Sequence, residues 1–266
     1  MRRRRISVSR LTRLDRSIRG RRALITGAAS GMGRATAFLF ADEGVELALA
    51  DRDAAELEAT AEAIRKAGGV VHTEVCDLEE ALAPEALVDA AARQLGGLEI
   101  VVNNAGIAPE AAIDSEDYER AWARTLRVDL EVLALIIRRA LPHLLKSDAA
   151  RVVNIASTEG LGATAGISPY TASKHGVIGL TRALAVELGA RGVNVNCVCP
   201  GPIHTGLTQG IDDAAKQKFA RRRVPLRRYG DPEEVAQATL SLVLPAASYI
   251  NGAVLVVDGG MTAQNT

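Results

Sequence analysis

A tyrosine and a lysine stand four residues apart in the stretch SPYTASKHGVIGLTRALAVELGARGVNVN, residues 168–196. If this stretch is helical, Tyr170 and Lys174 share one face. With four tyrosines and five lysines in 266 residues, such a match arises by chance in fewer than roughly one chain in ten. An ammonium beside a phenol favours the phenolate, which lowers a tyrosine pKa from about 10 and prepares it to move a proton. The alternative is a solvated helix surface without chemistry.

Ser157 closes the aliphatic run RVVNIAS, thirteen residues before Tyr170. Taken alone, Ser157 would be no more than a hydroxyl that ends a strand.

The composition favours one α/β domain with an aliphatic core. Of the residues, 48% are hydrophobic and 3% aromatic, and no apolar run reaches the roughly 20 residues of a membrane span. We expect Cys76, Cys197 and Cys199 to be core residues of a reducing, cytoplasmic compartment, with the last two facing opposite sides of a strand. No metal site is predicted.

The net charge of zero hides a split between the two parts of the chain. Residues 1–22 contain ten arginines and one acid, Asp15, a balance of +9, and the remainder carries 22 basic and 31 acidic residues, a balance of −9. We expect residues 1–20 to be a mobile appendage. Their arginines, interspersed with Leu11, Leu14 and Ile18, could also touch anionic lipid or nucleic acid, or act as a transit peptide. The acidic body argues against a nucleic-acid-binding domain.

Short aliphatic runs alternate with longer amphipathic ones from residue 21 to residue 266. The runs are 23–26, 45–50, 70–75, 99–103, 151–156, 193–198 and 253–258, and helical segments include 53–67, 116–146, 170–190 and 231–244. Strands that alternate with helices predict a doubly wound, mostly parallel seven-stranded sheet of the Rossmann type in a single domain. Ligands bind such sheets beyond the carboxyl ends of the strands.

The first predicted strand is followed by TGAASGMGRATA, in which Gly27, Gly31 and Gly33 are spaced around a strand-to-helix turn. Glycines there let the backbone approach a pyrophosphate at the positive end of the next helix. Packing of the turn alone is the alternative. We therefore predict that this turn binds a nucleotide.

The next three strands also end in polar residues. Asp51 could accept hydrogen bonds from the adenosine ribose and would repel a 2′-phosphate, which favours NAD over NADP, although Arg52 could bind that phosphate. Asp53 fits better as a helix cap. Asp77 could accept a hydrogen bond from the adenine amino group, and NNAG at 103–106 is suited to a backbone that lies close to a ribose.

In combination, TGAASGMG, NNAG, Ser157, YTASK and CPGPIHT make residues 20–262 resemble the short-chain dehydrogenase/reductase family. The resemblance implies hydride transfer between NAD and a secondary alcohol or ketone. Tyr170 would then be the acid/base, Lys174 would hold the nicotinamide ribose, and Ser157 would bind the substrate oxygen. The cofactor-binding residues it implies, with those argued above, are Gly27, Ser30, Gly31, Met32, Gly33, Asp51, Arg52, Asp77, Leu78, Asn103, Ala105, Gly106, Tyr170, Lys174, Pro200, Gly201, Ile203 and Thr205.

One position departs from the family pattern. Asp129 lies where the family usually has an asparagine that holds a water in a proton relay to the lysine. An aspartate accepts from a water but cannot donate as an amide does, and it adds a negative charge. We count Asp129 with Ser157, Tyr170 and Lys174 as the catalytic set and expect it to alter the pH profile.

The sequence leaves the substrate open. The predicted substrate loop, residues 202–229, is basic, which could recruit an anionic substrate or could be a solvated face that pairs with another subunit. Glu159 would disfavour an anion near the reacting carbon. The leading hypothesis is an NAD-dependent dehydrogenase of a small-molecule secondary alcohol, and the alternatives are an NADPH-dependent 3-oxoacyl-carrier-protein reductase and a catalytically impaired nucleotide-binding regulator. By resemblance we expect a homotetramer, with no nucleic-acid partner.

Overall fold

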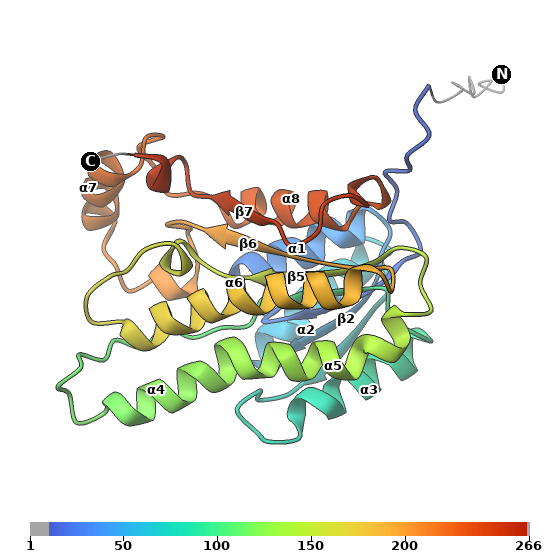
Figure 1. Ribbon diagram of the computed structural model, residues 1–266, viewed down its shortest axis with the longest axis horizontal. Helices are drawn as coiled ribbons and strands as arrows, with labels where there is room; N and C mark the ends of the chain where they lie inside the picture. The colour runs from blue at the N-terminus through green and yellow to red at the C-terminus, as the bar shows by residue number, and fades with distance from the viewer. Residues whose placement is uncertain (1–10, 265–266) are drawn as a thin grey trace.

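A seven-stranded parallel sheet forms the centre of the protein in a computed structural model that describes residues 11–264 (Figure 1). Its strand order is β3-β2-β1-β4-β5-β6-β7, and every neighbouring pair is parallel. The strands are β1 (Arg22–Thr26), β2 (Glu46–Asp51), β3 (Val71–Val75), β4 (Ile100–Asn103), β5 (Ala150–Ile155), β6 (Val193–Pro200) and β7 (Val254–Val257). The predicted doubly wound fold is confirmed.

Helices cover both faces of the sheet, which is why its central strands are almost entirely buried. One core cluster packs the sheet against α1 (Gly31–Asp42), α2 (Ala54–Lys66) and α8 (Pro232–Val243). Another packs the opposite face against α3 (Ala83–Leu95), α5 (Val132–Leu144) and α6 (Ser168–Gly189). The order reverses between β1 and β4, so ligands are expected beyond the carboxyl ends of these strands.

The long helix predicted over 116–146 is divided. It consists of α4 (Tyr118–Leu126), a π-helical turn η1 (Arg127–Glu131) and α5. Single π turns inside helices occur frequently at functional sites. Here the turn contains Asp129, whose side chain is fully buried.

Residues 1–10 of the arginine-rich head lie outside the described residues. Of its apolar residues, Leu11 is 99% exposed, whereas Ile18 is 1% exposed and belongs to a core cluster. The Gly20 amide donates to the Gly44 carbonyl at 2.8 Å. The packed chain therefore begins at Ile18, before the boundary predicted at residue 20.

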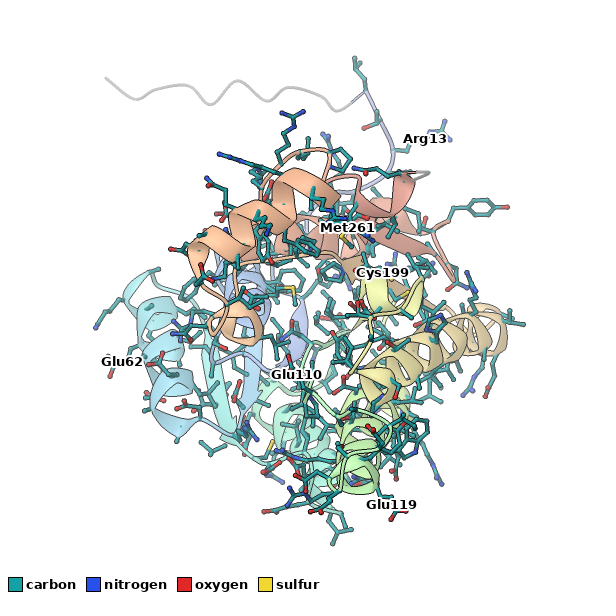
Figure 2. The ribbon with its side chains drawn as sticks, turned by 90° about the vertical axis from the view of Figure 1, so that its left-hand side faces the viewer. Arg13, Glu62, Glu110, Glu119, Cys199 and Met261 are labelled. Atoms are coloured by element: carbon teal, nitrogen blue, oxygen red, sulfur yellow. The ribbon has the colours of Figure 1, made fainter. Side chains whose placement is uncertain are left out.

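The expectation that Cys197 and Cys199 face opposite sides is wrong, because residues two apart on a strand point to the same face. Both are fully buried in one cluster beside α6. In Figure 2, Cys199 lies inside the molecule, whereas Arg13, Glu62 and Glu119 lie at its periphery. Burial raises the pKa of the Cys76 thiol to about 11, which keeps it protonated and unreactive.

Within residues 11–264, no helix combines the length and the apolar character that a membrane crossing requires. No group of three or more His, Cys, Asp or Glu side chains in that range is arranged to hold a metal ion.

Candidate active site

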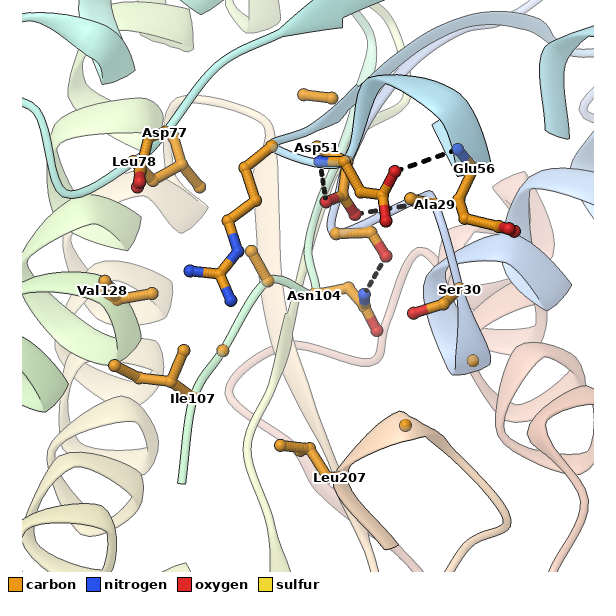
Figure 3. Close-up of a pocket in the computed structure, with 18 of the residues that line it drawn as sticks. Ala29, Ser30, Asp51, Glu56, Asp77, Leu78, Asn104, Ile107, Val128 and Leu207 are labelled. Carbon is orange, nitrogen blue, oxygen red and sulfur yellow. Dashed lines mark hydrogen bonds between the residues drawn. The ribbon is translucent and has the colours of Figure 1, made fainter. Parts of the chain in front are cut away.

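A cavity of about 440 Å³ opens where β1, β2, β3 and β4 end (Figure 3). Its volume lies within the range of cofactor pockets. Eleven of the predicted cofactor-binding residues line it: Gly27, Ser30, Gly31, Met32, Asp51, Arg52, Asp77, Leu78, Ala105, Gly106 and Thr205. The structure thus gathers four strand ends, far apart in the sequence, around one space.

The glycine turn between β1 and α1 is shaped for close approach. Gly27 adopts a φ of 67°, which favours glycine. A Cβ on Gly33 would lie 2.0 Å from the Gly27 carbonyl oxygen, so Gly33 packs the helix against the turn rather than lining the cavity. Ser30 to Met32 bring the first turn of α1 to the cavity wall, where its amides lack intrahelical partners and can bind an anion.

Asp51 ends β2 at the wall of this cavity. Its carboxylate accepts hydrogen bonds from the Ala29 amide at 3.0 Å and the Asp53 amide at 3.1 Å (Figure 3). Each oxygen keeps a lone pair for a further donor. Asp53 itself accepts from the Glu56 amide at 3.1 Å, which confirms the prediction that it caps α2.

Further charges surround Asp51. Arg52 Nη1 lies 3.9 Å from Glu79 Oε1. Glu79 and Glu56 both line the cavity, although sequence reasoning did not select them. Acidic side chains predominate in this part of the wall, but Glu56 pairs with Arg34 and Glu79 pairs with Arg124, so Arg52 approaches a carboxylate that already has a cation.

The structure assigns different roles to the two asparagines of NNAG. Asn103 is buried and donates to the Asn154 side chain at 2.9 Å, within the sheet. Asn104 lines the cavity, and its amide nitrogen donates to the Thr26 and Gly27 carbonyls at 3.0 Å. Asn104 rather than Asn103 therefore lines the cavity, and any contact of Asn103 with a ligand there would be made by its backbone, as expected of NNAG from the sequence.

Pro200, Gly201 and Ile203 do not line this cavity and instead support the loop that carries Thr205. A Cβ on Gly201 would lie 2.6 Å from that of Asp258, and Ile203 is 5% exposed. The loop places Thr205 against the glycine turn, where a Cβ on Gly31 would lie 3.2 Å from Thr205 Cβ. Ile107, Val128 and Leu207 complete the wall and are apolar residues that sequence reasoning missed.

The four predicted catalytic side chains also come together. Lys174 Nζ lies 5.3 Å from the centre of the Tyr170 ring and 3.4 Å from Asp129 Oδ2. It donates to the Ile155 carbonyl, which ends β5, at 3.2 Å. Ser157 Oγ accepts from the Glu159 amide at 3.1 Å, which leaves its proton free to donate.

Burial and charge compete at Tyr170. Burial raises the pKa of Tyr170, Lys174 and a hydrogen bond with Ser157 lower it, and Asp129 adds to the rise. The net pKa lies above the ordinary value. Lys174 lowers the pKa of Tyr170 as expected, but burial and the charge of Asp129 together raise it more.

Asp129 and Lys174 form a buried ion pair. The Lys174 side chain is 4% exposed and that of Asp129 is fully buried. Burial lowers the pKa of Lys174, but the neighbouring Asp129 and Tyr170 raise it more, so the ammonium stays charged. Burial raises the pKa of Asp129 against the opposing pull of Lys174. Asp129 Oδ1 also accepts the Ile107 amide at 2.8 Å, which ties η1 to the loop after β4.

These features fit a bound dinucleotide. The glycine turn and the amides of α1 suit a pyrophosphate, and the carboxylate of Asp51 suits a ribose diol. Asn104 Oδ1, buried and without a hydrogen-bond partner in the described residues, borders the same cavity. Lys174 lies behind Gly106, where a Cβ would be 3.4 Å from its Nζ, so the predicted catalytic side chains adjoin the cavity.

Comparison with known proteins decides the family. A family model described as enoyl-(acyl carrier protein) reductase matches residues 27–262. The chain belongs to the short-chain dehydrogenase/reductase family. It is 42% identical to the cis-4-hydroxycyclohexanecarboxylate dehydrogenase of Sinomonas cyclohexanicum, over 91% of this chain and 96% of that protein.

Two further members of the short-chain dehydrogenase/reductase family frame the possible activities. The 3-oxoacyl-(acyl-carrier-protein) reductase of Thermotoga maritima is 35% identical, over 92% of this chain and 98% of its own length. The crystal structure of a short chain dehydrogenase from Burkholderia cenocepacia in complex with NADP matches with a TM-score of 0.86 and 32% identity, covering 92% of this chain and 99% of that one. The present chain is accordingly an oxidoreductase that acts on CH–OH groups.

Proposed function

We propose that this protein interconverts a small secondary alcohol and its ketone with NAD as the preferred cofactor and Tyr170 as the acid/base. The observation that carries the proposal is the placement of Lys174. Its ammonium lies 5.3 Å from the Tyr170 ring, directly behind the loop that borders the cavity. A proton-transfer group and a dinucleotide pocket are thus adjacent.

The residues divide the reaction among them. Ser157 donates to the substrate oxygen, and Tyr170 removes the alcohol proton in oxidation or supplies it in reduction. Lys174 favours the phenolate and is held by Asp129 and the Ile155 carbonyl. The dinucleotide supplies or accepts the hydride when it is bound.

The acidic wall of the cavity supports NAD. Asp51 is fixed by two amides, and Glu56 and Glu79 line the same wall. A 2′-phosphate would bring negative charge against the Asp51 carboxylate, whereas Glu56 and Glu79 are paired with Arg34 and Arg124. Arg52, which could offset that charge, lies near Glu79.

Cofactor titration tests this preference. We expect the protein to bind NADH at least about tenfold more tightly than NADPH, a difference of about 1.4 kcal/mol. Replacing Asp51→Ser should reduce this preference for NADH over NADPH, because it removes the repulsion between the Asp51 carboxylate and the 2′-phosphate. Equal or tighter binding of NADPH by the unaltered protein would refute the preference.

Two alternatives remain from the sequence. A 3-oxoacyl-carrier-protein reductase is favoured by the relative of that name and by the three arginines at the end of α7 (Asp213–Arg223), which could attract an anionic carrier. An impaired regulator is disfavoured because Ser157, Tyr170 and Lys174 are all present and brought together.

Screening the purified protein against secondary alcohols with NAD, and against 3-oxoacyl thioesters with NADPH, separates the alternatives. Absorbance of the reduced cofactor reports both reactions.

We propose a cytoplasmic location, because the cysteines of the described residues are free. We also propose that residues 1–10 are dispensable for catalysis.

A further inference from the structure

Glu159 is held beside both residues that would bind the substrate oxygen. It lies in the short helix η2 (Thr158–Gly160), and its amide donates to Ser157 Oγ at 3.1 Å. Its carboxylate accepts from Thr164 Oγ1 at 2.7 Å and from Thr171 Oγ1 at 2.9 Å. Because Thr171 directly follows Tyr170, the carboxylate is fixed between the first turn of α6 and the loop at 161–167.

The charge of Glu159 acts on the reaction centre. It contributes to raising the pKa of Tyr170, so the carboxylate and the phenol are electrostatically coupled. The carboxylate accepts hydrogen bonds from two neutral hydroxyl groups, and within residues 11–264 no lysine or arginine forms an ion pair with it. Residues 161–166 of the adjoining loop are exposed, and the Glu159 side chain is only partly buried. Each carboxylate oxygen also keeps a lone pair for another donor.

We propose that Glu159 is a specificity-determining residue, which favours substrates with a neutral hydroxyl on the carbon next to the reacting one and rejects a carboxylate there. The substrate class is then vicinal diols and the matching hydroxyketones. This inference rests on the proposed function, because Ser157 and Tyr170 must hold the substrate oxygen.

The physical basis is that a substrate hydroxyl can donate a hydrogen bond to the Glu159 carboxylate, whereas a substrate carboxylate carries the same charge as Glu159. With the reacting oxygen on Ser157 and Tyr170, the substituent of the adjacent carbon comes near Glu159. A hydroxyl there donates to the carboxylate in a charge-assisted hydrogen bond. A substrate carboxylate there meets a like charge that no cation of the described chain neutralises.

Three four-carbon ketones test the inference: 3-hydroxybutan-2-one, with a hydroxyl beside the carbonyl, 2-oxobutanoate, with a carboxylate there, and butan-2-one, with neither. In each reduction, the carbonyl carbon takes a hydride from NADH and the oxygen takes a proton from Tyr170. The products are the alcohol and NAD. The measured quantity is kcat/KM for each ketone.

We expect the unaltered protein to prefer 3-hydroxybutan-2-one over 2-oxobutanoate by at least about tenfold, or about 1.4 kcal/mol. In the Glu159→Gln variant, which keeps the shape and an acceptor oxygen, this ratio should fall several-fold, mainly because 2-oxobutanoate improves. The matched control is Glu62→Gln on the exposed face of α2, which should leave the ratio unchanged. A preference for 2-oxobutanoate, or an unchanged ratio in Glu159→Gln, overturns the inference.

A binding measurement keeps this inference separate from the proposed function. If no ketone is turned over, the proposed function fails, but calorimetry can still compare the binding of the three ketones to the NADH-loaded unaltered protein, which keeps both Ser157 and Tyr170. The inference predicts tightest binding of 3-hydroxybutan-2-one and weakest binding of 2-oxobutanoate, with the difference reduced by Glu159→Gln. An equal or reversed order, or no binding of any of the three, overturns it.

Discussion

Asp129 has two opposing effects on the Tyr170 phenolate, one through Lys174 and one direct. Its ammonium favours the Tyr170 phenolate, while Asp129, 3.4 Å away, holds that ammonium charged and at the same time disfavours the phenolate. An asparagine at this position would make the hydrogen bond to the Ile107 amide without adding the charge. The pH dependence of the reaction should therefore depend on Asp129.

Replacing Asp129→Asn tests this coupling. Oxidation needs the phenolate, so its rate rises with pH through the pKa of Tyr170. Because Asp129 raises that pKa, the variant should reach half of its maximal kcat/KM at a lower pH than the unaltered protein. At pH values below the midpoint of the unaltered protein, the variant should have the higher kcat/KM for oxidation. Its kcat at the optimal pH should change by less than about tenfold. An unchanged midpoint would show that Asp129 does not influence Tyr170.

At the scale of elements, the glycine turn depends on the fit of α1 against β1. A methyl group on Gly33 would stand 2.0 Å from the Gly27 carbonyl oxygen and 2.5 Å from Asn104 Nδ2. Both are fixed parts of the turn, so α1 would have to move. The same displacement would disturb the amides at the cavity wall.

We therefore expect Gly33→Ala to destabilise the protein by about 1–3 kcal/mol, in the range of overpacked sites, and to weaken dinucleotide binding. The matched control is Gly179→Ala in α6, where no heavy atom lies within 4 Å of the added Cβ. That change should be neutral or stabilise by up to about 1 kcal/mol. Thermal unfolding with and without NADH measures both, and equal effects of the two substitutions would contradict the packing argument.

The same scale shows what the sequence could predict. The inner strands are buried on both faces, whereas the edge strands β3 and β7 are partly exposed. All seven could be located as short apolar-rich runs, and the polar residues after them marked the cavity. The π turn at Asp129 could not be predicted, because residues 116–146 have an unbroken helical pattern. Which of the two asparagine side chains of NNAG faces the cavity could not be read from the sequence, because one residue at the end of a strand decides which way a side chain points. The sequence could not predict that Glu56 and Glu79 line the cavity, because this depends on how the elements that carry them are placed in space.

For the whole molecule, apolar side chains remain exposed where α6 meets the segment before β7. Val186 is 86% exposed and Ile250 is 41% exposed. The Asn251 side chain donates to the Ala185 carbonyl at 2.8 Å, which brings these two segments together. This exposed apolar surface is where we expect contacts between the subunits of the homotetramer that the family resemblance implies.

Sedimentation velocity tests this assembly. We expect the unaltered protein to sediment as a species with four times the chain mass of 28.0 kDa. Val186→Glu places a charge on the exposed surface and should yield smaller species, with little effect on the folding of each chain. A monomeric unaltered protein would refute the tetramer, and an intact tetramer of the variant would exclude this surface from the contact.

The most direct test of the central claim is the turnover of Tyr170→Phe with NAD and a secondary alcohol from the screen, beside its affinity for NADH. The substitution removes the oxygen that we propose as the acid/base and keeps the ring that lies under Lys174. We expect kcat to fall by about 10²–10⁴, the usual contribution of general acid–base catalysis, with the NADH Kd changed by less than about threefold. Undiminished turnover in the Tyr170→Phe protein would contradict the account.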